Sequence, residues 1–407
     1  MNETVLQDAR GSDADHGSPT RRGAALVIIA LAVGSFGIGT GEFAIMGLLP
    51  DIAVGLEVSV PTAGYLISAY ALGVVIGAPA IALLAAKLSR RNLLLLLMLG
   101  FGLGNLLGAI APDMLTLTLS RFLSGLPHGA YFGVAALVAA SIASPGRRAQ
   151  SIGRVMLGLT IATLIGSPVA AWLGQQFGWR SLFLLVSSIG MLTVLLLWLT
   201  LPRDEAHPEA SVWRELGAFM KPQIWLTFAF AALGFGGMFA VVSYIAATAT
   251  VVSGLPASFV PFILAIFGTG MIIGNILGAW LADRSLVGTI GGVLCLNIVV
   301  LMVFWLTAQY PVMLCVCVFF VGFGVALAPA VQARLMDVAG DAQTLAAASM
   351  HSAFNIANAV GAWLGGLAIA AGYGYASTGW VGAALALAGL IVFGISIRAD
   401  GHHRVVP

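Results

Sequence analysis

The stretch GNILGAWLADR, residues 274–284, decides the fold, because it closes a long apolar run with small residues and then a charged pair. The same arrangement occurs earlier in the chain, where a stretch that begins at Gly77 ends at Lys87. Both stretches have the same length, and each ends the second long apolar run in its half of the chain. This repeat predicts a chain built from two related halves of the same orientation.

The composition indicates that most of this chain lies in a membrane. Of its 407 residues, 60% are apolar and 8% are charged, whereas soluble proteins carry roughly 25% charged residues. The mean hydropathy of +1.02 agrees. A water-soluble enzyme, a nucleic-acid-binding protein and a disulfide-bonded secreted domain are therefore excluded. The three cysteines lie in apolar runs without the spacing of a metal site, so no metal or other cofactor is expected.

Twelve apolar runs are long enough to cross a bilayer, because a helix needs about 20 residues to span the hydrocarbon core. A helix satisfies its own backbone hydrogen bonds in hydrocarbon, so each run is expected to be helical. The expected fold is all-α, with twelve transmembrane helices. The runs lie at about residues 24–49, 61–86, 92–111, 114–142, 150–175, 181–201, 223–250, 257–282, 287–307, 311–335, 343–371 and 376–398.

A long polar stretch, residues 202–222, lies at the midpoint, with six runs before it and six after it. We expect an N-terminal six-helix bundle over residues 24–201, a linker over 202–222 and a C-terminal six-helix bundle over 223–398. Residues 1–23 are expected to form a disordered tail, and residues 399–407 a second tail. Sixteen of the eighteen basic residues fall on the side of the tails and the linker. Basic loops stay in the cytoplasm, so both termini are predicted to be cytoplasmic, in a bacterial-type inner membrane.

Several motifs resemble those of one transporter family. The stretch at 274–284, the twelve runs and the six-plus-six division are similar to the major facilitator superfamily. GTGEF at 39–43, followed by GLLPDIA at 47–53, resembles the first span of its drug:proton antiporter members. RFLSGLPHGAYFG at 121–133 resembles the arabinose-efflux and sugar-efflux permeases. The resemblance implies two pseudo-symmetric six-helix bundles, no enzyme activity and a monomer in the bilayer.

Two further motifs are assigned through this resemblance. The antiport-type pattern of the fifth run corresponds to Gly158, Gly166, Pro168 and Gly174. The loop and gating motif corresponds to Gly77, Lys87, Arg90, Arg91, Gly274, Gly278, Asp283 and Arg284. The family usually has aspartate where this chain has Ala86. The charge contact between the two halves is therefore expected to be weaker, or to be carried by Asp283.

Two charged residues lie deep within the apolar runs. Mapping the acidic and basic residues onto the runs leaves one acid, Glu42, and one base, Arg121, well inside. Their distances along the chain from Asp51 and Asp113 place both about 12–14 Å below one surface, at 1.5 Å per residue. Intramembrane charge is costly and therefore indicates a functional site. We predict that Glu42 exchanges the proton and that Arg121, in the same site, tunes the proton affinity of Glu42. The alternative is that each side chain separately snorkels to the surface or bonds to backbone.

Uncharged polar and aromatic residues extend this candidate site. His128 lies seven residues after Arg121, on nearly the same helix face, and is predicted to relay protons or to bind substrate. Its alternative is a neutral histidine bonded to a neighbouring hydroxyl or carbonyl. The candidate substrate-cavity residues are Phe43, Tyr131, His351, Asn355 and Asn358. The last three form a polar stripe on one helix face, which either lines the cavity or bonds to neighbouring helices. Packing is the alternative for the tyrosine.

The expected function is a proton-coupled antiporter that exports a small organic solute, such as a sugar, a nucleoside or a drug-like compound, by alternating access. Its expected partners are that solute, protons and the lipid bilayer, and no nucleic acid. One alternative is a facilitator or importer of sugars or nucleosides without proton coupling. The other is a membrane receptor or scaffold, which the short predicted tails and linker disfavour.

Overall fold

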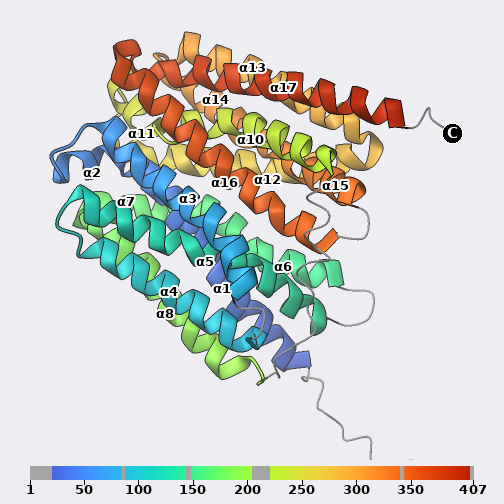
Figure 1. The fold of residues 1–407 in the computed structure, drawn as a ribbon. Coiled ribbons are helices and arrows are strands. Elements are labelled where there is room, and N and C mark those ends of the chain that lie inside the picture. The colour runs from blue at the N-terminus through green and yellow to red at the C-terminus, as the bar shows by residue number, and fades with distance from the viewer. Residues whose placement is uncertain (1–20, 85–87, 144–147, 204–220, 340–342, 404–407) are drawn as a thin grey trace, which may run out of the picture.

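The computed structural model describes residues 21–84, 88–143, 148–203, 221–339 and 343–403 (Figure 1). Within these ranges, twelve helices are long and apolar enough to cross a membrane, and no strand occurs. The prediction of an all-α protein with twelve spans is therefore confirmed.

The helical segments of the first half are α1 (Arg21–Gly47), α2 (Leu49–Gly55), α3 (Val60–Leu84), α4 (Arg90–Ala109), α5 (Met114–Ser141), α6 (Arg148–Ile161), η3 (Ala162–Gly166), α7 (Ser167–Phe177) and α8 (Arg180–Thr200). Those of the second half are α10 (Pro222–Val242), α11 (Ile245–Ala247), η5 (Thr248–Val252), η6 (Ala257–Phe259), α12 (Val260–Arg284), α13 (Leu286–Thr307), α14 (Pro311–Phe323), η7 (Gly324–Ala326), α15 (Leu327–Ala339), α16 (Gln343–Ala368), η8 (Ile369–Tyr373), η9 (Tyr375–Ser377) and α17 (Thr378–His403). We call α1–α8 the N-terminal bundle and α10–α17 the C-terminal bundle.

Two predicted runs are interrupted in the structure. The run predicted over 24–49 ends at Gly47, and α2 follows with Pro50 at its second position. Proline lacks an N–H donor and fixes its own φ, so the first helix does not continue regularly into it. The run predicted over 223–250 breaks after Val242. Next to this break, the Tyr244 hydroxyl donates to the Ala362 carbonyl of α16 at 2.8 Å, which ties the broken segment to a neighbouring helix.

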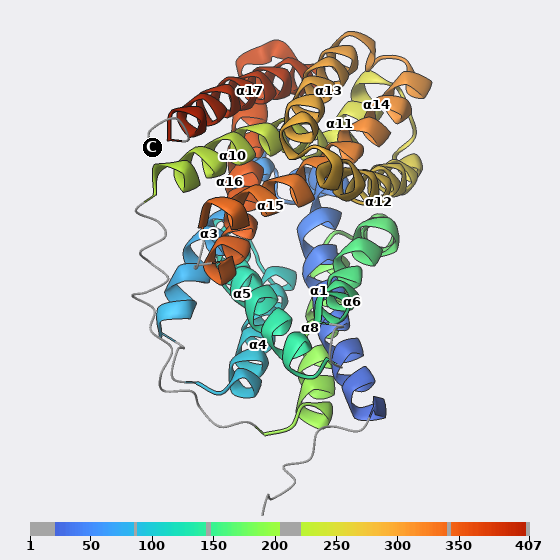
Figure 2. The same cartoon turned by 90° about the vertical axis from the view of Figure 1, so that its right-hand side faces the viewer.

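The helices of each half gather in a bundle of their own. Figures 1 and 2 show the N-terminal bundle, blue to green, beside the C-terminal bundle, yellow to red. In the N-terminal bundle α3 packs on α5 and α4 on α8; in the C-terminal bundle α12 packs on α14 and α10 on α17. The two most extensive contacts between the bundles place α3 against α16 and α7 against α12.

Matching glycine contacts show the predicted internal repeat at the level of packing. A Cβ added to Gly77 of α3 would lie 2.1 Å from the carbonyl oxygen of Leu126 in α5. A Cβ added to Gly274 of α12 would lie 2.4 Å from the carbonyl oxygen of Phe323 in α14. Both residues of the second contact lie 197 positions after those of the first. Only a residue without a side chain permits such close backbone approach, which is how helices associate tightly in lipid.

The two bundles are in contact at one end of the molecule. Because twelve spans separate residues 21 and 403, these residues lie on the same side, which we call the termini side. The loops around residues 56–59, 110–113 and 308–310 form the opposite side. At the opposite side, the Gln175 amide of α7 donates to the Ala257 carbonyl at 2.9 Å. The bundles are therefore joined at the opposite side in this conformation.

Candidate functional site

Glu42 lies on α1 at the contact between the two bundles. Its side chain is 3% exposed. The Asn358 side-chain amide, on α16 of the C-terminal bundle, donates a hydrogen bond to Glu42 Oε1 at 3.3 Å. The next residue, Phe43, reaches toward the same bundle, with ring centroids 6.5 Å from Phe239 and 6.2 Å from Phe267. The Glu42 carboxyl thus lies beside an aromatic contact between the two bundles and next to one amide of the C-terminal bundle.

Arg121 lies on α5 and is 1% exposed. Its guanidinium carbon lies 4.1 Å from the centroid of the Tyr70 ring on α3 and 6.0 Å from that of Phe183 on α8. A cation over an aromatic face is attracted by the electron-rich ring, and the attraction is strongest where water is excluded. Among the described residues, Nε and Nη1 have no hydrogen-bond partner. The base predicted deep in the membrane is therefore held by rings and keeps unused donors.

Glu42 and Arg121 act on each other electrostatically without touching. No ion pair of 4 Å or less joins their side chains in the described part of the chain, and each charge acts on the other and on the Tyr70 hydroxyl. Glu42 and Arg121, which we expected at similar depth, therefore interact electrostatically. Direct contact between them does not occur in this conformation.

Tyr70 connects the predicted residues and was not identified from the sequence. Its hydroxyl lies 3.0 Å from Nδ1 of His128, while its ring supports the guanidinium of Arg121. Gly125 makes this possible, because a Cβ there would lie 2.2 Å from the Tyr70 carbonyl oxygen. The available signal was a hydroxyl-bearing aromatic residue inside an apolar run, which sequence alone does not separate from ordinary packing. His128 is bonded to a neighbouring hydroxyl, as its alternative interpretation expected.

His351 forms a second contact between the bundles. Its ring stacks on Phe132 of α5, with centroids 4.9 Å apart and planes 3° apart. The His128 ring lies 6.3 Å from His351 and 5.2 Å from Phe132. These three rings therefore join α5 to α16. Phe132, like Tyr70, was missed because an isolated phenylalanine carries no sequence signal for such a contact.

The remaining cavity candidates make mainly structural contacts. The Tyr131 hydroxyl donates to the Leu31 carbonyl of α1 at 2.7 Å, over Gly34, so it packs α5 on α1. The Asn355 amide donates to the His351 carbonyl one turn earlier at 2.9 Å, and its buried Oδ1 has no partner among the described residues. The predicted polar stripe on α16 is therefore divided: Asn355 bonds its own helix, whereas Asn358 reaches Glu42.

The antiport-type residues of the fifth span face α1, the helix that carries Glu42. A Cβ on Gly158 would lie 2.1 Å from the Ala32 carbonyl oxygen, and Cβ atoms on Gly166 and Gly174 would meet α1 and the loop after it. The segment Ala162–Gly166 forms a π-helical turn that ends two residues before Pro168. Such turns often accompany functional sites in helices. The fifth span is therefore irregular within the antiport-type motif.

The loop and gating motif divides into packing residues and surface charges. Gly77, Gly274 and Gly278 each face the backbone of a neighbouring helix. Arg91 donates to the Trp198 carbonyl at 2.8 Å, and Arg90 is the first residue of α4. Asp283 and Arg284 are exposed, and the guanidinium lies over Trp280 at 3.3 Å.

The charge contact expected between the halves is not formed by Asp283 in this conformation. Asp283 has no ion pair with any residue that the structure describes. Lys87 and Ala86 lie outside the described residues.

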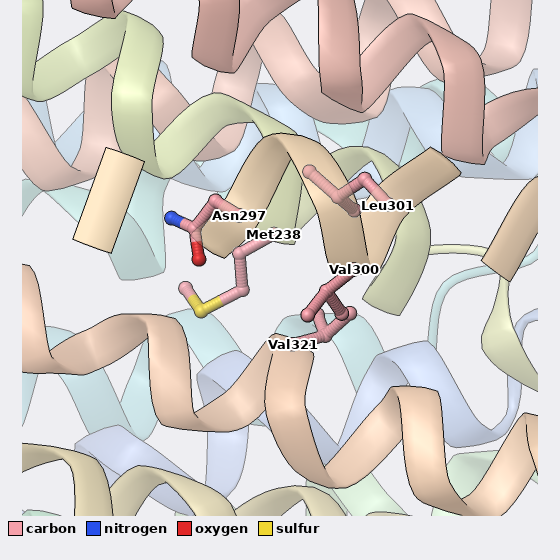
Figure 3. A pocket seen from close by; sticks show the side chains of 5 residues that line it. All are labelled: Met238, Asn297, Val300, Leu301 and Val321. Atoms are coloured by element: carbon pink, nitrogen blue, oxygen red, sulfur yellow. The ribbon is translucent and has the colours of Figure 1, made fainter. Parts of the chain in front are cut away.

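A small void inside the C-terminal bundle lies apart from this site. It is lined by Met238, Asn297, Val300, Leu301 and Val321 (Figure 3). It leaves no room for a water-sized sphere. It is therefore a packing defect beside a polar side chain. Elsewhere in the described ranges, no three His, Cys, Asp or Glu side chains are grouped as metal ligands would be.

Sequence and structure comparisons agree on one family. The sequence profile of the Major Facilitator Superfamily matches residues 31–308. The inner membrane transport protein YdhP of Escherichia coli (strain K12) is 42% identical over 368 residues, which are 90% of this chain and 95% of YdhP. The putative transporter AraJ of the same strain is 36% identical over 354 residues, which are 86% of this chain and 89% of AraJ.

Solved structures agree on the fold. A bacterial homologue of the human lysosomal transporter Spinster, in an inward-facing and unoccupied conformation, is similar with a TM-score of 0.71 and 18% identity. The similarity covers 93% of this chain and 96% of that one. By its sequence and its twelve-helix fold, this chain belongs to the Major Facilitator Superfamily and is a membrane transporter.

Proposed function

We propose that this transporter is a proton-coupled antiporter, which exports a small organic solute across a bacterial-type inner membrane and has both termini in the cytoplasm. The observation that carries the proposal is the position of Glu42. Its carboxyl is buried between the bundles, forms no ion pair with any described residue, and receives its hydrogen bond from the opposite bundle. An intramembrane carboxyl of this kind can exchange a proton when the bundles move.

The exchange follows from alternating access of one site. With the termini side in the cytoplasm, the contacts at the opposite side close the protein toward the exterior. In this conformation Glu42 exchanges its proton with the cytoplasm, and solute enters from the same compartment. When the bundles rock to the other conformation, solute leaves to the exterior and a proton binds Glu42. The two loads then alternate at one site, which is what obligatory exchange requires.

Other residues have supporting roles in this proposal. Arg121 sets the electrostatic field at Glu42, and Tyr70 and His128 form a hydrogen-bonded pair beside it. Unused hydrogen-bonding atoms remain on the Arg121 guanidinium and on Asn355 Oδ1. Buried donors and acceptors without partners are costly, so a solute that offers both kinds of group would be bound favourably there. Sugars, nucleosides and several drug-like compounds meet this condition.

The test is solute-driven proton movement in inside-out membrane vesicles with an acidified interior. The panel contains arabinose, a purine nucleoside, chloramphenicol and ethidium, and luminal pH is read with a fluorescent dye. At least one compound is expected to raise the luminal pH in the wild type and not in Glu42→Gln. The control is Asp51→Asn, because Asp51 is an acid on α2 outside the membrane-spanning helices.

Two results would contradict the proposal. Full solute-driven proton movement in Glu42→Gln would show that another group carries the proton. Solute flux that is unchanged when an ionophore collapses the pH gradient would favour the uncoupled facilitator.

A further inference from the structure

The only hydrogen bond of the Glu42 carboxyl within the described residues comes from the other bundle. Asn358 Nδ2 donates to Glu42 Oε1 at 3.3 Å, across 316 positions of sequence. Asn358 is fully buried, and its own Oδ1 has no partner among the described residues. One half of the amide is therefore satisfied and the other half is not.

The chemistry of the two groups explains this unused oxygen. A carboxylate offers only acceptors, whereas a protonated carboxyl offers one acceptor and one O–H donor. An amide offers the complementary pair, an N–H donor and a carbonyl acceptor. When Glu42 binds a proton, its O–H can donate to Asn358 Oδ1 while the existing N–H bond is kept. When Glu42 is charged, Oδ1 stays buried without a partner, which costs free energy.

This pair forms where the bundles approach each other. The residue after Asn358 takes part in a second contact between them, because the Ser68 hydroxyl of α3 donates to the Ala359 carbonyl at 3.1 Å. The amide–carboxyl pair therefore lies within a contact of α16 with the N-terminal bundle. When this contact is formed, every polar atom of the Asn358 amide has a partner only if Glu42 carries a proton.

We propose that Asn358 is a positioning residue that makes closure of the opposite side depend on the protonation of Glu42. The proposal rests on the proposed function, since it treats Glu42 as the proton carrier. It adds a contact that disfavours closure of the opposite side while Glu42 is charged and carries no proton. The only proton that moves is taken up by Glu42 from one compartment and released to the other.

Few other titratable or charged groups of the described residues act on Glu42. From α5 the Arg121 guanidinium acts on it, and from α3 the Tyr70 hydroxyl does. His128 is bonded to that hydroxyl, and His351 lies beyond it against the His128 ring. None of these four groups crosses between the bundles to touch the carboxyl. The hydrogen bond of Asn358 is thus the contact through which the protonation of Glu42 acts on α16.

The experiment measures closure directly with spin labels on opposite bundles. Labels at Val54 and Val312, both exposed at the opposite side, report the distance between the bundles in lipid nanodiscs, in a background without native cysteines. In the wild type we expect the short-distance population to grow as the pH falls from mildly alkaline to mildly acidic. Glu42→Gln should be closed at every pH, because its amide supplies the donor that Oδ1 lacks.

Variants of Asn358 separate its role from general packing. Asn358→Ala should lose the pH dependence, and Glu42→Gln/Asn358→Ala should lower the closed-to-open ratio of Glu42→Gln about tenfold, which is about 1.4 kcal/mol. The exchanged pair Glu42→Gln/Asn358→Asp keeps one acid and one amide at nearly constant shape. It should restore the pH-dependent closure. Ile356→Ala, at an exposed position of the same helix, is the control, and it should behave as the wild type.

The outcomes distinguish this proposal from the proposed function. Wild-type pH dependence in Asn358→Ala, or its absence in the exchanged pair, overturns the role of Asn358. If the role of Asn358 is overturned but Glu42→Gln loses solute-driven proton movement in vesicles, the antiporter proposal is still supported. If Glu42→Gln keeps that proton movement, the proposed function fails, and the proposal for Asn358 fails with it.

Discussion

Replacing Gly77 by alanine tests whether close backbone packing fixes the geometry of the site. The added Cβ would lie 2.1 Å from the Leu126 carbonyl oxygen and 2.5 Å from the Leu126 Cα. Ordinary contacts begin near 3.4 Å, so α3 must move away from α5 by more than about 1 Å at this point. Both atoms belong to backbone, so no flexible side chain can give way. Overpacking of this kind costs about 1–3 kcal/mol.

Gly133→Ala is the matched control, because a Cβ at that position of α5 meets nothing within 4 Å. Both substitutions gain the same helix propensity, about 0.5–1 kcal/mol, so the difference between the two variants isolates the steric cost. Gly274→Ala should resemble Gly77→Ala, since its Cβ would lie 2.4 Å from the Phe323 carbonyl oxygen.

The assay is thermal unfolding of the purified protein in detergent, compared at one scan rate because membrane proteins often unfold irreversibly. In domains of 150–250 residues, 1 kcal/mol shifts Tm by roughly 2–4 °C. We therefore expect Gly77→Ala and Gly274→Ala to unfold several degrees below Gly133→Ala. Equal Tm values for all three variants would refute the packing argument and the repeat based on it.

Three further predictions concern the site and one helix end. Tyr70→Phe leaves Nδ1 of His128 without its partner at 3.0 Å and should cost about 1–3 kcal/mol, read as a lower Tm; an unchanged Tm would contradict the bond. Tyr70→Leu also removes the ring under Arg121 and should lower the stability by about 2 kcal/mol more than Tyr70→Phe. Equal Tm values for the two variants would exclude a contribution of the cation–ring attraction. The backbone N–H of Thr116 donates to Asp113 and lowers the pKa of that carboxyl. The stability that this hydrogen bond contributes is thus present at neutral pH and is lost as the pH falls through the lowered pKa of Asp113. Asp113→Ala should lower Tm at neutral pH by an amount that shrinks in acid, and a gap independent of pH would contradict this.

Sequence alone predicted the spans because hydrocarbon leaves the backbone few options. Each long apolar run had to form a helix, and the repeated stretch at 274–284 identified the two halves. The break before Pro50 was readable from its missing donor, yet the apolar run around it concealed the exact end of the helix. The π-helical turn at Ala162–Gly166 was not predictable, since nothing but Pro168 interrupts the run there.

The sequence predicted a depth for the two charged residues but gave no rotation of any side chain about its helix axis. Counting residues from the loops gave Glu42 and Arg121 similar depth, and both are buried. The count contains no information on the direction of each side chain around its helix axis. It therefore missed Tyr70, which lies under the guanidinium, and it could not pair Asn358 with Glu42 across 316 positions.

The central claim is that the Glu42 carboxyl binds and releases a proton. Infrared difference spectroscopy of the purified protein in lipid, recorded through a pH titration, detects the carbonyl stretch of a protonated carboxyl. Partial burial raises the pKa of Asp51, so this residue can also contribute a band, and Asp51→Asn is the necessary control. We expect a band that changes with pH in the wild type and in Asp51→Asn and that is missing in Glu42→Gln. A titrating band that persists unchanged in Glu42→Gln would contradict the central claim.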